Sequence, residues 1–316
     1  MGQGTWAGDM GKLAGLLGSA ARRDVPIGAL TTYRVGGAAA LFYEPGSEED
    51  LERLGSALAV VAVPVLVLGK GSNLLVADSG WPGLCVRLGA GLGAVEVEGT
   101  DVVTGAAASC PVLARRSSAA GLAGMEWAVG IPGSVGGAVR MNAGGHGAET
   151  KDRLLSARVL HLAGGGDDIV PATSLGLSYR HSLIASSDLV VSARFKLEEG
   201  SAAQGAARIG EIVAWRRENQ PGGQNAGSVF TNPPGDSAGR LVEAAGLKGF
   251  RMGTAAVSGK HANFIQADAG GRAEDVRRLV EHVRATVARV TGIELGVELR
   301  TVGWDPQLRG CDQPCS

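Results

Sequence analysis

Residues 65–76 read VLVLGKGSNLLV, which is an apolar strand pattern, a glycine-rich turn and a second apolar strand pattern. In the turn, Gly69, Lys70, Gly71, Ser72 and Asn73 follow the first strand directly. Successive backbone N–H groups in such a turn can form a concave anion-binding site, and the pyrophosphate of a dinucleotide suits it. The stretch lacks the third glycine of the Rossmann fingerprint and runs into a strand rather than a helix. A tight turn between two strands is an equally good interpretation of this loop alone.

The segments around this turn alternate between strand and helix patterns. Residues 31–45 alternate and are bounded by Gly and Pro, whereas residues 48–62 show helical spacing behind Ser47 and an acidic first turn. Residues 89–200 contain many short strands and one helix, and residues 201–294 contain helices around short strands. The order predicts an α+β chain with an α/β unit first, a strand-rich second lobe and a helix-rich C-terminal region.

The composition is that of a globular protein, because 45% of the 316 residues are hydrophobic and 19% are charged. The formal net charge is −1, so no overall charge attracts the chain to nucleic acid or to an anionic membrane. No apolar run reaches the roughly 20 residues of a bilayer span, and no signal-peptide pattern occurs, so we expect a soluble, cytoplasmic protein. Cys311 and Cys315 have no partner ligands nearby and no HExxH motif occurs, so we expect no metal.

A second glycine cluster occupies residues 128–147, AVGIPGSVGGAVRMNAGGHG. Pro132 presets φ, and the pair Gly133 and Ser134 can open a short helix whose N–H groups face a phosphate. The following glycines leave no side chain between the backbone and an extended ligand. Close packing of a helix on a sheet would also explain these glycines. Two phosphate-type loops roughly 60 positions apart favour a dinucleotide that contacts both.

The stretches GKGSNLLV and GIPGSVGGAVRMNAG resemble the FAD-binding domain of the p-cresol methylhydroxylase and vanillyl-alcohol oxidase type. Further stretches occur in the order TTYRVGGAAALF, LSYRHS, AGSVFTNPPGDSAGRLVEAAGLKG, VSGKHANFI and VELRTVG. Together they closely resemble the UDP-N-acetylenolpyruvoylglucosamine reductase (MurB) family over about residues 30–303. Only about 48 residues separate Arg180 from Ser228, which resembles the shorter-loop subtype of that family.

The resemblance implies an α+β fold, in which a two-lobed FAD-binding domain precedes an α+β substrate-binding domain. The expected divisions are an N-terminal extension (1–24), the FAD-binding domain (25–200, with lobes at about 25–88 and 89–200), the substrate-binding domain (201–294), a C-terminal strand returning toward the active site (295–304) and a disordered tail (305–316).

The resemblance also implies the activity. NADPH would reduce a non-covalently bound FAD, which would reduce UDP-N-acetyl-3-O-(1-carboxyvinyl)glucosamine to UDP-N-acetylmuramate for peptidoglycan synthesis. We expect a monomer, with no nucleic-acid or membrane partner. The cofactor-binding residues implied are Gly69, Lys70, Gly71, Ser72, Asn73, Leu74, Gly130, Pro132, Gly133, Ser134, Gly137, Ala138 and Asn142.

Three residues match catalytic positions of the family. Ser228 matches the proton donor, Arg180 matches the arginine that binds the substrate carboxylate, and Glu298 matches the catalytic glutamate. The substrate-binding residues implied are Tyr179, Arg180, Asn232, Lys248, His261 and Asn263. From spacing alone, Ser228 would be a turn residue, Arg180 a surface ion-pair partner and Glu298 a strand-edge carboxylate paired with Arg300.

Two positions depart from the family pattern. His146 stands where many members have a tyrosine after NAG, and His181 stands where the family has an aspartate in YRDS. Neither is one of the three catalytic positions, but both leave the substrate contacts open. Two alternative functions also stay open. One is an alcohol or aldonolactone oxidase of the same FAD fold, whose flavin is often tethered to His or Cys, and the other is a non-catalytic UDP-sugar-binding homologue.

Overall fold

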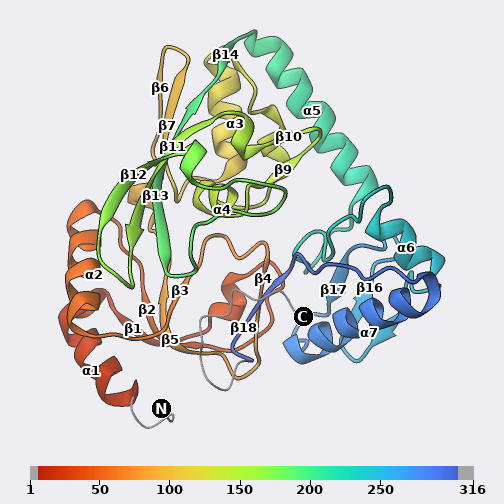
Figure 1. Cartoon of the computed structure of the whole chain (residues 1–316), viewed down its shortest axis with the longest axis horizontal. Helices are drawn as coiled ribbons and strands as arrows, with labels where there is room; N and C mark the ends of the chain where they lie inside the picture. The colour runs from red at the N-terminus through yellow and green to blue at the C-terminus, as the bar shows by residue number, and fades with distance from the viewer. Residues whose placement is uncertain (1–5, 305–316) are drawn as a thin grey trace. The chain divides into compact units, whose positions relative to one another are not determined.

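The computed structural model describes residues 6–304, whose helices and strands are drawn in Figure 1. These residues pack as two compact units. The first contains the described residues up to Arg23, Leu41–Lys70 and Gly83–Arg216, and the second contains Asp24–Ala40, Gly71–Pro82 and the described residues from Arg217 onward. Two N-terminal segments therefore fold with the C-terminal part of the chain. The domain boundaries expected from the sequence are a functional division, which this packing does not test.

The elements have the following bounds. The helices are α1 (Trp6–Leu17), α2 (Glu48–Val60), α3 (Cys110–Ala119), α4 (Val135–Arg140), α5 (Ala202–Asn219), α6 (Ala238–Ala244) and α7 (Ala273–Thr291). The strands are β1 (Arg22–Val25), β2 (Ala39–Tyr43), β3 (Val65–Val67), β4 (Leu74–Val76), β5 (Trp81–Val86), β6 (Val95–Glu98), β7 (Asp101–Gly105), β8 (Leu122–Ala123), β9 (Gly144–Gly145), β10 (Ala148–Glu149), β11 (Leu154–His161), β12 (Asp167–Pro171), β13 (Asp188–Lys196), β14 (Glu198–Glu199), β15 (Arg251–Met252), β16 (Ala255–Val257), β17 (Ile265–Ala267) and β18 (Arg300–Val302).

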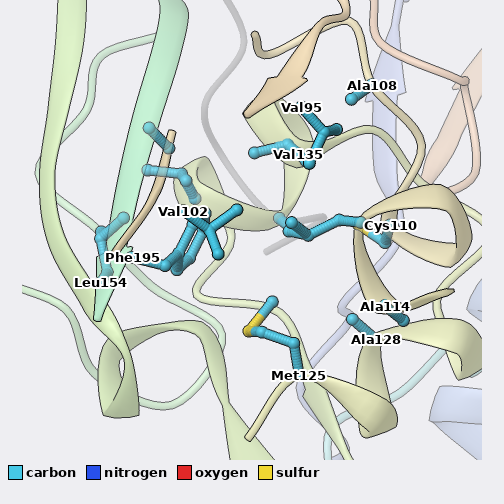
Figure 2. Close-up of a cluster of buried hydrophobic side chains, with 14 of the residues drawn as sticks. Val95, Val102, Ala108, Cys110, Ala114, Met125, Ala128, Val135, Leu154 and Phe195 are labelled. Atoms are coloured by element: carbon cyan, nitrogen blue, oxygen red, sulfur yellow. The ribbon is translucent and has the colours of Figure 1, made fainter. Parts of the chain in front are cut away.

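The largest sheet of the first unit has five antiparallel strands in the order β12-β11-β13-β7-β6. Apolar side chains from one face of this sheet pack with α3 and α4 into a continuous core. Figure 2 shows Val102, Leu154 and Phe195 of the sheet, together with Cys110 of α3 and Val135 of α4. This core fixes the start of α4, and the second glycine cluster lies there.

A second core of the first unit forms between α1, α2 and the strands beside them. Helix α2 begins as its sequence predicts, because the Ser47 side chain accepts a hydrogen bond from the Asp50 N–H at 3.2 Å. Leu51 and Leu54 of α2 are buried there with Leu13 of α1. Strand β3, which precedes the glycine turn, pairs in parallel with β5.

The second unit is organised around α7, whose apolar residues recur every three or four positions and are buried. The antiparallel sheet β15-β16-β17 and helix α6 pack on the same core, which also receives Tyr33 and Leu75. Strand β18 pairs in parallel with β4, and Leu74 lies opposite Arg300. The C-terminal strand therefore lies beside the strand that follows the glycine turn.

The expected strand over residues 31–45 is largely wrong, since only Ala39–Tyr43 forms one. The residues before it are irregular because their backbone lies directly against the backbone of residues 76–80, so closely that a side chain would not fit between them. A Cβ on Gly36, whose φ is +104°, would lie 2.2 Å from the Val76 carbonyl oxygen. The expected tail, 305–316, lies outside the described residues. Within residues 6–304, no helix combines the length and the apolar character needed to cross a bilayer.

Candidate active site

The glycine turn between β3 and β4 is shaped by two close approaches. A Cβ on Gly69 would lie 2.5 Å from the Ser134 hydroxyl oxygen. A Cβ on Gly71, whose φ is +63°, would lie 2.6 Å from the Thr31 Cα. The Gly71 carbonyl accepts hydrogen bonds from the Thr32 N–H at 3.1 Å and from the Thr32 hydroxyl at 3.3 Å. Thr32, in the stretch TTYRVGG, therefore helps to hold the turn, a role that the sequence pattern did not predict.

The backbone N–H groups of this turn are available to a ligand. Within residues 6–304, no backbone or side-chain acceptor binds the N–H groups of residues 69–73. Lys70 is exposed, and Leu74 already belongs to β4. Five successive N–H groups without an internal acceptor, on a backbone anchored through Gly71, suit a bound anion.

The second glycine loop meets the first turn at Ser134, which begins helix α4. Its hydroxyl accepts a hydrogen bond from the Gly137 N–H at 3.3 Å. The N–H groups of Val135 and Gly136 donate to backbone carbonyls of the segment before α3, at 2.8 and 3.1 Å. The prediction that the first N–H groups of this helix face a phosphate is therefore wrong, because the chain itself occupies all three.

The residues just before α4 provide other donors. Gly133 and Ser134 are both buried, and no acceptor among the described residues binds their N–H groups. Buried backbone N–H groups are nearly always paired in folded proteins, so these two indicate a place for a ligand. Pro132 is exposed beside them, whereas Ala138 lies buried inside α4.

Gly130 lies in a small cluster with His146, Trp215 and Arg216. The Gly130 carbonyl accepts a hydrogen bond from the Arg216 guanidinium, and burial lowers the pKa of Arg216. The His146 ring packs edge-on against Trp215, with the ring centroids 5.2 Å apart. Burial lowers the pKa of His146, and the nearby arginine charges act in the same direction. These effects favour a neutral imidazole at this departure from the family pattern.

Asn142 is completely buried, and its side chain is used within the protein. Its amide nitrogen donates to Glu149 Oε2 at 3.0 Å and to the Ser178 carbonyl at 2.8 Å. Its amide oxygen accepts a hydrogen bond from the Lys151 N–H at 2.9 Å. The side chain predicted to contact the cofactor therefore braces the turn that carries Arg180.

Arg180 sits at the tip of a tight turn closed by two hydrogen bonds between Ser178 and His181, both 3.1 Å. Its φ of +56° is a left-handed conformation that non-glycine residues rarely adopt. One guanidinium nitrogen donates to the Gly144 carbonyl at 3.1 Å. The guanidinium carbon lies 4.9 Å from the ring centroid of the half-exposed Tyr179. A strained residue held this firmly is a reasonable candidate for function.

In the second unit, Ser228 begins a short extended segment, 228–230, that is paired on both edges. Ser228 lies opposite Phe264 on one edge, and Phe230 lies opposite Val297 on the other. Ser228 is half-buried, whereas the next two residues are fully buried. The predicted proton donor therefore stands at the end of a firmly held piece of backbone.

Glu298 lies on the neighbouring segment. Its N–H donates to the Val229 carbonyl at 2.8 Å. Its own carbonyl accepts a hydrogen bond from the Asn73 side chain at 3.0 Å, and the Asn73 carbonyl accepts one from the Arg300 N–H at 3.1 Å. Asn73, predicted as a cofactor residue, therefore joins the glycine turn to the segment just before β18 that carries Glu298, and Glu298 joins this segment to that of Ser228.

Asn263 packs on the opposite edge of segment 228–230. Only 4% of its surface is exposed. Its amide oxygen accepts from the Phe230 N–H at 2.9 Å, and its amide nitrogen donates to the Phe230 carbonyl at 2.8 Å. Its own N–H donates to His261 Nδ1 at 3.2 Å. Both amide groups are thus bound to the protein backbone, so the side chain has little left with which to contact a substrate.

The other predicted substrate residues surround helix α6. The Asn232 side-chain oxygen accepts a hydrogen bond from the Ala238 N–H at 3.0 Å. Asn232 is exposed, so its amide nitrogen can reach a ligand. His261 is half-buried, and this burial lowers its pKa. Lys248 is exposed and forms an ion pair with Glu243 at 2.8 Å. An amide, an imidazole and an ammonium near one helix can bind a polar, anionic ligand.

Two family models match the chain. The model described as "FAD binding domain" matches residues 39–166, and the one described as "UDP-N-acetylenolpyruvoylglucosamine reductase, C-terminal domain" matches residues 219–302. The first range contains both glycine loops. The second contains Ser228, Asn263 and Glu298.

Curated relatives are similar over nearly the whole length. A UDP-N-acetylenolpyruvoylglucosamine reductase of Acidiphilium cryptum is 45% identical, with 89% of this chain and 90% of the relative covered. One of Paramagnetospirillum magneticum is 42% identical, with 89% and 91% covered. Among solved structures, UDP-N-acetylenolpyruvylglucosamine reductase (MurB) from Thermus caldophilus is 36% identical with a TM-score of 0.78, and 90% of this chain and 100% of that chain are covered.

Proposed function

The chain belongs to the UDP-N-acetylenolpyruvoylglucosamine reductase family, and from this we propose that Arg180, Ser228 and Glu298 carry out its chemistry. It is a flavoprotein oxidoreductase of peptidoglycan synthesis that uses FAD and NADPH. The reaction adds a hydride and a proton across the enolpyruvyl double bond of a UDP-amino sugar. FAD, when bound, supplies the hydride transfer that connects NADPH with this double bond.

The residues of both glycine loops fit FAD. The N–H groups of residues 69–73, and those of Gly133 and Ser134, have no acceptor among the described residues. The pyrophosphate of FAD would supply acceptors for them. Gly69 and Ser134 approach so closely that a Cβ at Gly69 would meet the Ser134 hydroxyl. We propose that these loops hold FAD without a covalent bond.

The chemistry requires a cation and an acid near the enolpyruvyl group. Hydride addition at one carbon leaves negative charge on the neighbouring carbon, next to the substrate carboxylate. Arg180 would bind this carboxylate, because a guanidinium can donate two parallel hydrogen bonds and stays charged. Ser228 would deliver the hydroxyl proton to the carbanionic carbon, and water would then restore the hydroxyl. Glu298 would orient the carboxylate or the Ser228 hydroxyl from the adjoining backbone segment.

The observation that carries this proposal is the pairing of the Ser228 segment with the segment that carries Glu298. Two residues 70 positions apart in the sequence are joined through the hydrogen bond from the Glu298 N–H to the Val229 carbonyl at 2.8 Å. Through Asn73 the Glu298 segment is also tied to the glycine turn, so the proposed acid and the proposed glutamate stand on segments fixed to a loop that we assign to FAD. The substrate diphosphate would lie toward Asn232, Lys248 and His261.

Three finer proposals accompany the activity. We propose the shorter-loop subtype, from the spacing between Arg180 and Ser228, and a monomer, because one chain provides every proposed site residue. We propose the cytoplasm as its location, because the reaction consumes NADPH and a UDP-sugar. The domain roles expected from the sequence, FAD binding in 25–200 and substrate binding in 201–294, are also proposals.

The test is to measure the two half-reactions of the Ser228→Ala variant separately by stopped-flow flavin absorbance. Reduction by NADPH needs no proton from Ser228, so its rate should match that of the wild type. Reoxidation by the enolpyruvyl sugar should slow by at least about 10³-fold, because a positioned acid contributes about 10²–10⁴-fold and this one protonates carbon. Ser228→Cys should retain part of the activity. Reoxidation of the alanine variant at the wild-type rate would show that water or another residue supplies the proton.

A further inference from the structure

We infer that Asn263 is a positioning residue, whose buried amide holds the backbone segment from which Ser228 delivers its proton. The inference rests on the proposed role of Ser228. It also changes the role of Asn263, for which the sequence predicted a substrate contact. The reason is the direction of its hydrogen bonds, all of which end within the protein.

Three hydrogen bonds connect Asn263 with the two residues that follow Ser228. The side chain binds both polar groups of Phe230, accepting from its N–H at 2.9 Å and donating to its carbonyl at 2.8 Å. The Asn263 backbone carbonyl accepts a third bond from the Val229 N–H at 2.9 Å. The amide side chain therefore replaces a neighbouring strand at Phe230, which is fully buried.

The other edge of the segment is held mainly by backbone hydrogen bonds, with one further bond from the Thr231 hydroxyl to the Gly296 carbonyl at 3.3 Å. Val229 accepts from the Glu298 N–H, and the Thr231 N–H donates to the Gly296 carbonyl at 2.9 Å. Segment 228–230 is thus fixed from both sides, and on the Asn263 side a single side chain binds both backbone polar groups of Phe230. A substitution at Asn263 can release the segment without removing any atom of the proposed catalytic residues.

Asparagine is the residue that this geometry requires. Alanine would leave the N–H and the carbonyl of Phe230 buried without a partner. Aspartate would keep the acceptor for the N–H, but would place a second oxygen against the Phe230 carbonyl. That contact, together with burial, raises the pKa of the introduced carboxyl, and only its protonated form can donate to the carbonyl. An aspartate here should therefore act like asparagine at low pH and unlike it at high pH.

The first measurement compares both half-reactions of Asn263→Ala with the wild type. We expect reoxidation by the enolpyruvyl sugar to slow by about 10²-fold, the effect of misplacing a reacting group by about 1 Å. Flavin reduction by NADPH should stay within about twofold, because no proton from Ser228 enters that step. Hydrogen exchange at the Phe230 amide, measured by mass spectrometry without turnover, should accelerate. Val283→Ala, a substitution in the same core on α7, is the control for lost stability and should leave both half-reactions unchanged.

The second measurement uses Asn263→Asp, which keeps the test valid if the alanine variant does not fold. Its reoxidation rate should rise toward the wild-type rate as the pH is lowered through the range in which its carboxyl becomes protonated. A pH profile parallel to that of the wild type would overturn the inference.

A double variant separates this inference from the proposal on which it rests. In Ser228→Ala/Asn263→Ala, reoxidation should be within about twofold of Ser228→Ala alone, because Asn263 acts only through Ser228. If Ser228→Ala reoxidises normally, the proposed function fails. If Ser228→Ala is slow while Asn263→Ala is normal, only the positioning role fails. Multiplicative losses in the double variant would also overturn it, since they would show that Asn263 acts independently.

Discussion

Replacing Gly69 with alanine should weaken FAD binding through a single contact that the structure identifies. The new methyl group would lie 2.5 Å from the Ser134 hydroxyl oxygen, whereas ordinary contacts begin at 3.4 Å. Gly69 does not have a positive φ, so alanine can adopt its backbone conformation and the effect isolates the clash. Either the Ser134 hydroxyl rotates away and releases the Gly137 N–H, or the two loops separate by roughly 0.9 Å, and such adjustments cost about 1–3 kcal/mol. If that strain falls on the FAD-bound conformation, the Kd for FAD rises roughly 5- to 150-fold.

The assay is a titration of the flavin-free protein with FAD, followed by the quenching of flavin fluorescence. Ser134→Ala in the Gly69→Ala background should restore binding, because the Ser134 Cβ is 3.7 Å from the new methyl group. Ser134→Ala alone removes the N-cap of α4, which costs about 1 kcal/mol of stability. The Kd of the double variant should therefore lie within about threefold of that of Ser134→Ala.

Gly71→Ala provides the matched control. Its methyl group would meet the Thr31 backbone and its φ is +63°, so Ser134→Ala should not rescue it. If Gly69→Ala/Ser134→Ala binds FAD no better than Gly69→Ala, the contact between the loops does not control binding. Unchanged affinity in Gly69→Ala alone would refute the position assigned to FAD.

Two further predictions concern other parts of the first unit. Arg180→Lys keeps the charge but loses the bidentate geometry, so kcat/KM should fall by about 10²–10³-fold. Flavin reduction by NADPH should stay normal. A parallel fall in both half-reactions would mean that Arg180 serves the cofactor or the fold. The hydrogen bond with Asp188 (2.8 Å), followed by the charges of Asp188 and Asp168, raises the pKa of His161. Its stabilising contribution is therefore complete below the unfolded-state pKa and is lost as the pH rises through the folded-state pKa. As the pH rises above about 6.5, the Tm should therefore fall more in the wild type than in His161→Gln.

Local signals predicted the elements that depend on neighbouring residues. Ser47 with three acidic residues after it predicted the start of α2, and the hydroxyl bond to the Asp50 N–H confirms the cap. The glycine turn between two strands could also be predicted from the sequence, because glycine spacing and apolar runs are both local signals. The irregular path of residues 31–38 could not be predicted. Alternating residues favour a strand, but close crossings with the segment before β5 override that preference.

At the candidate site, too, features set by neighbouring residues could be predicted from the sequence, whereas features set by distant segments could not. The sequence predicted that the GIPGS stretch opens a helix, and α4 does begin at Val135. It could not show that backbone carbonyls before α3 already occupy the first N–H groups of that helix, because those partners come from a segment about 27 positions earlier. The free donors are therefore the N–H groups of Gly133 and Ser134, just before the helix.

The roles of Asn73 and Asn263 follow from this. Both lie in stretches that resemble the family, and asparagine in a binding motif suggests a ligand contact. In the structure, each amide binds the backbone of a distant segment: Asn73 binds Glu298, 225 positions away, and Asn263 binds Phe230, 33 positions away. A periodic pattern contains no information on such bonds, since they depend on tertiary pairing. Because these two residues hold the segments of Glu298 and Ser228, a family motif here marks the scaffold of the proposed site as well as the groups that we propose contact the substrate.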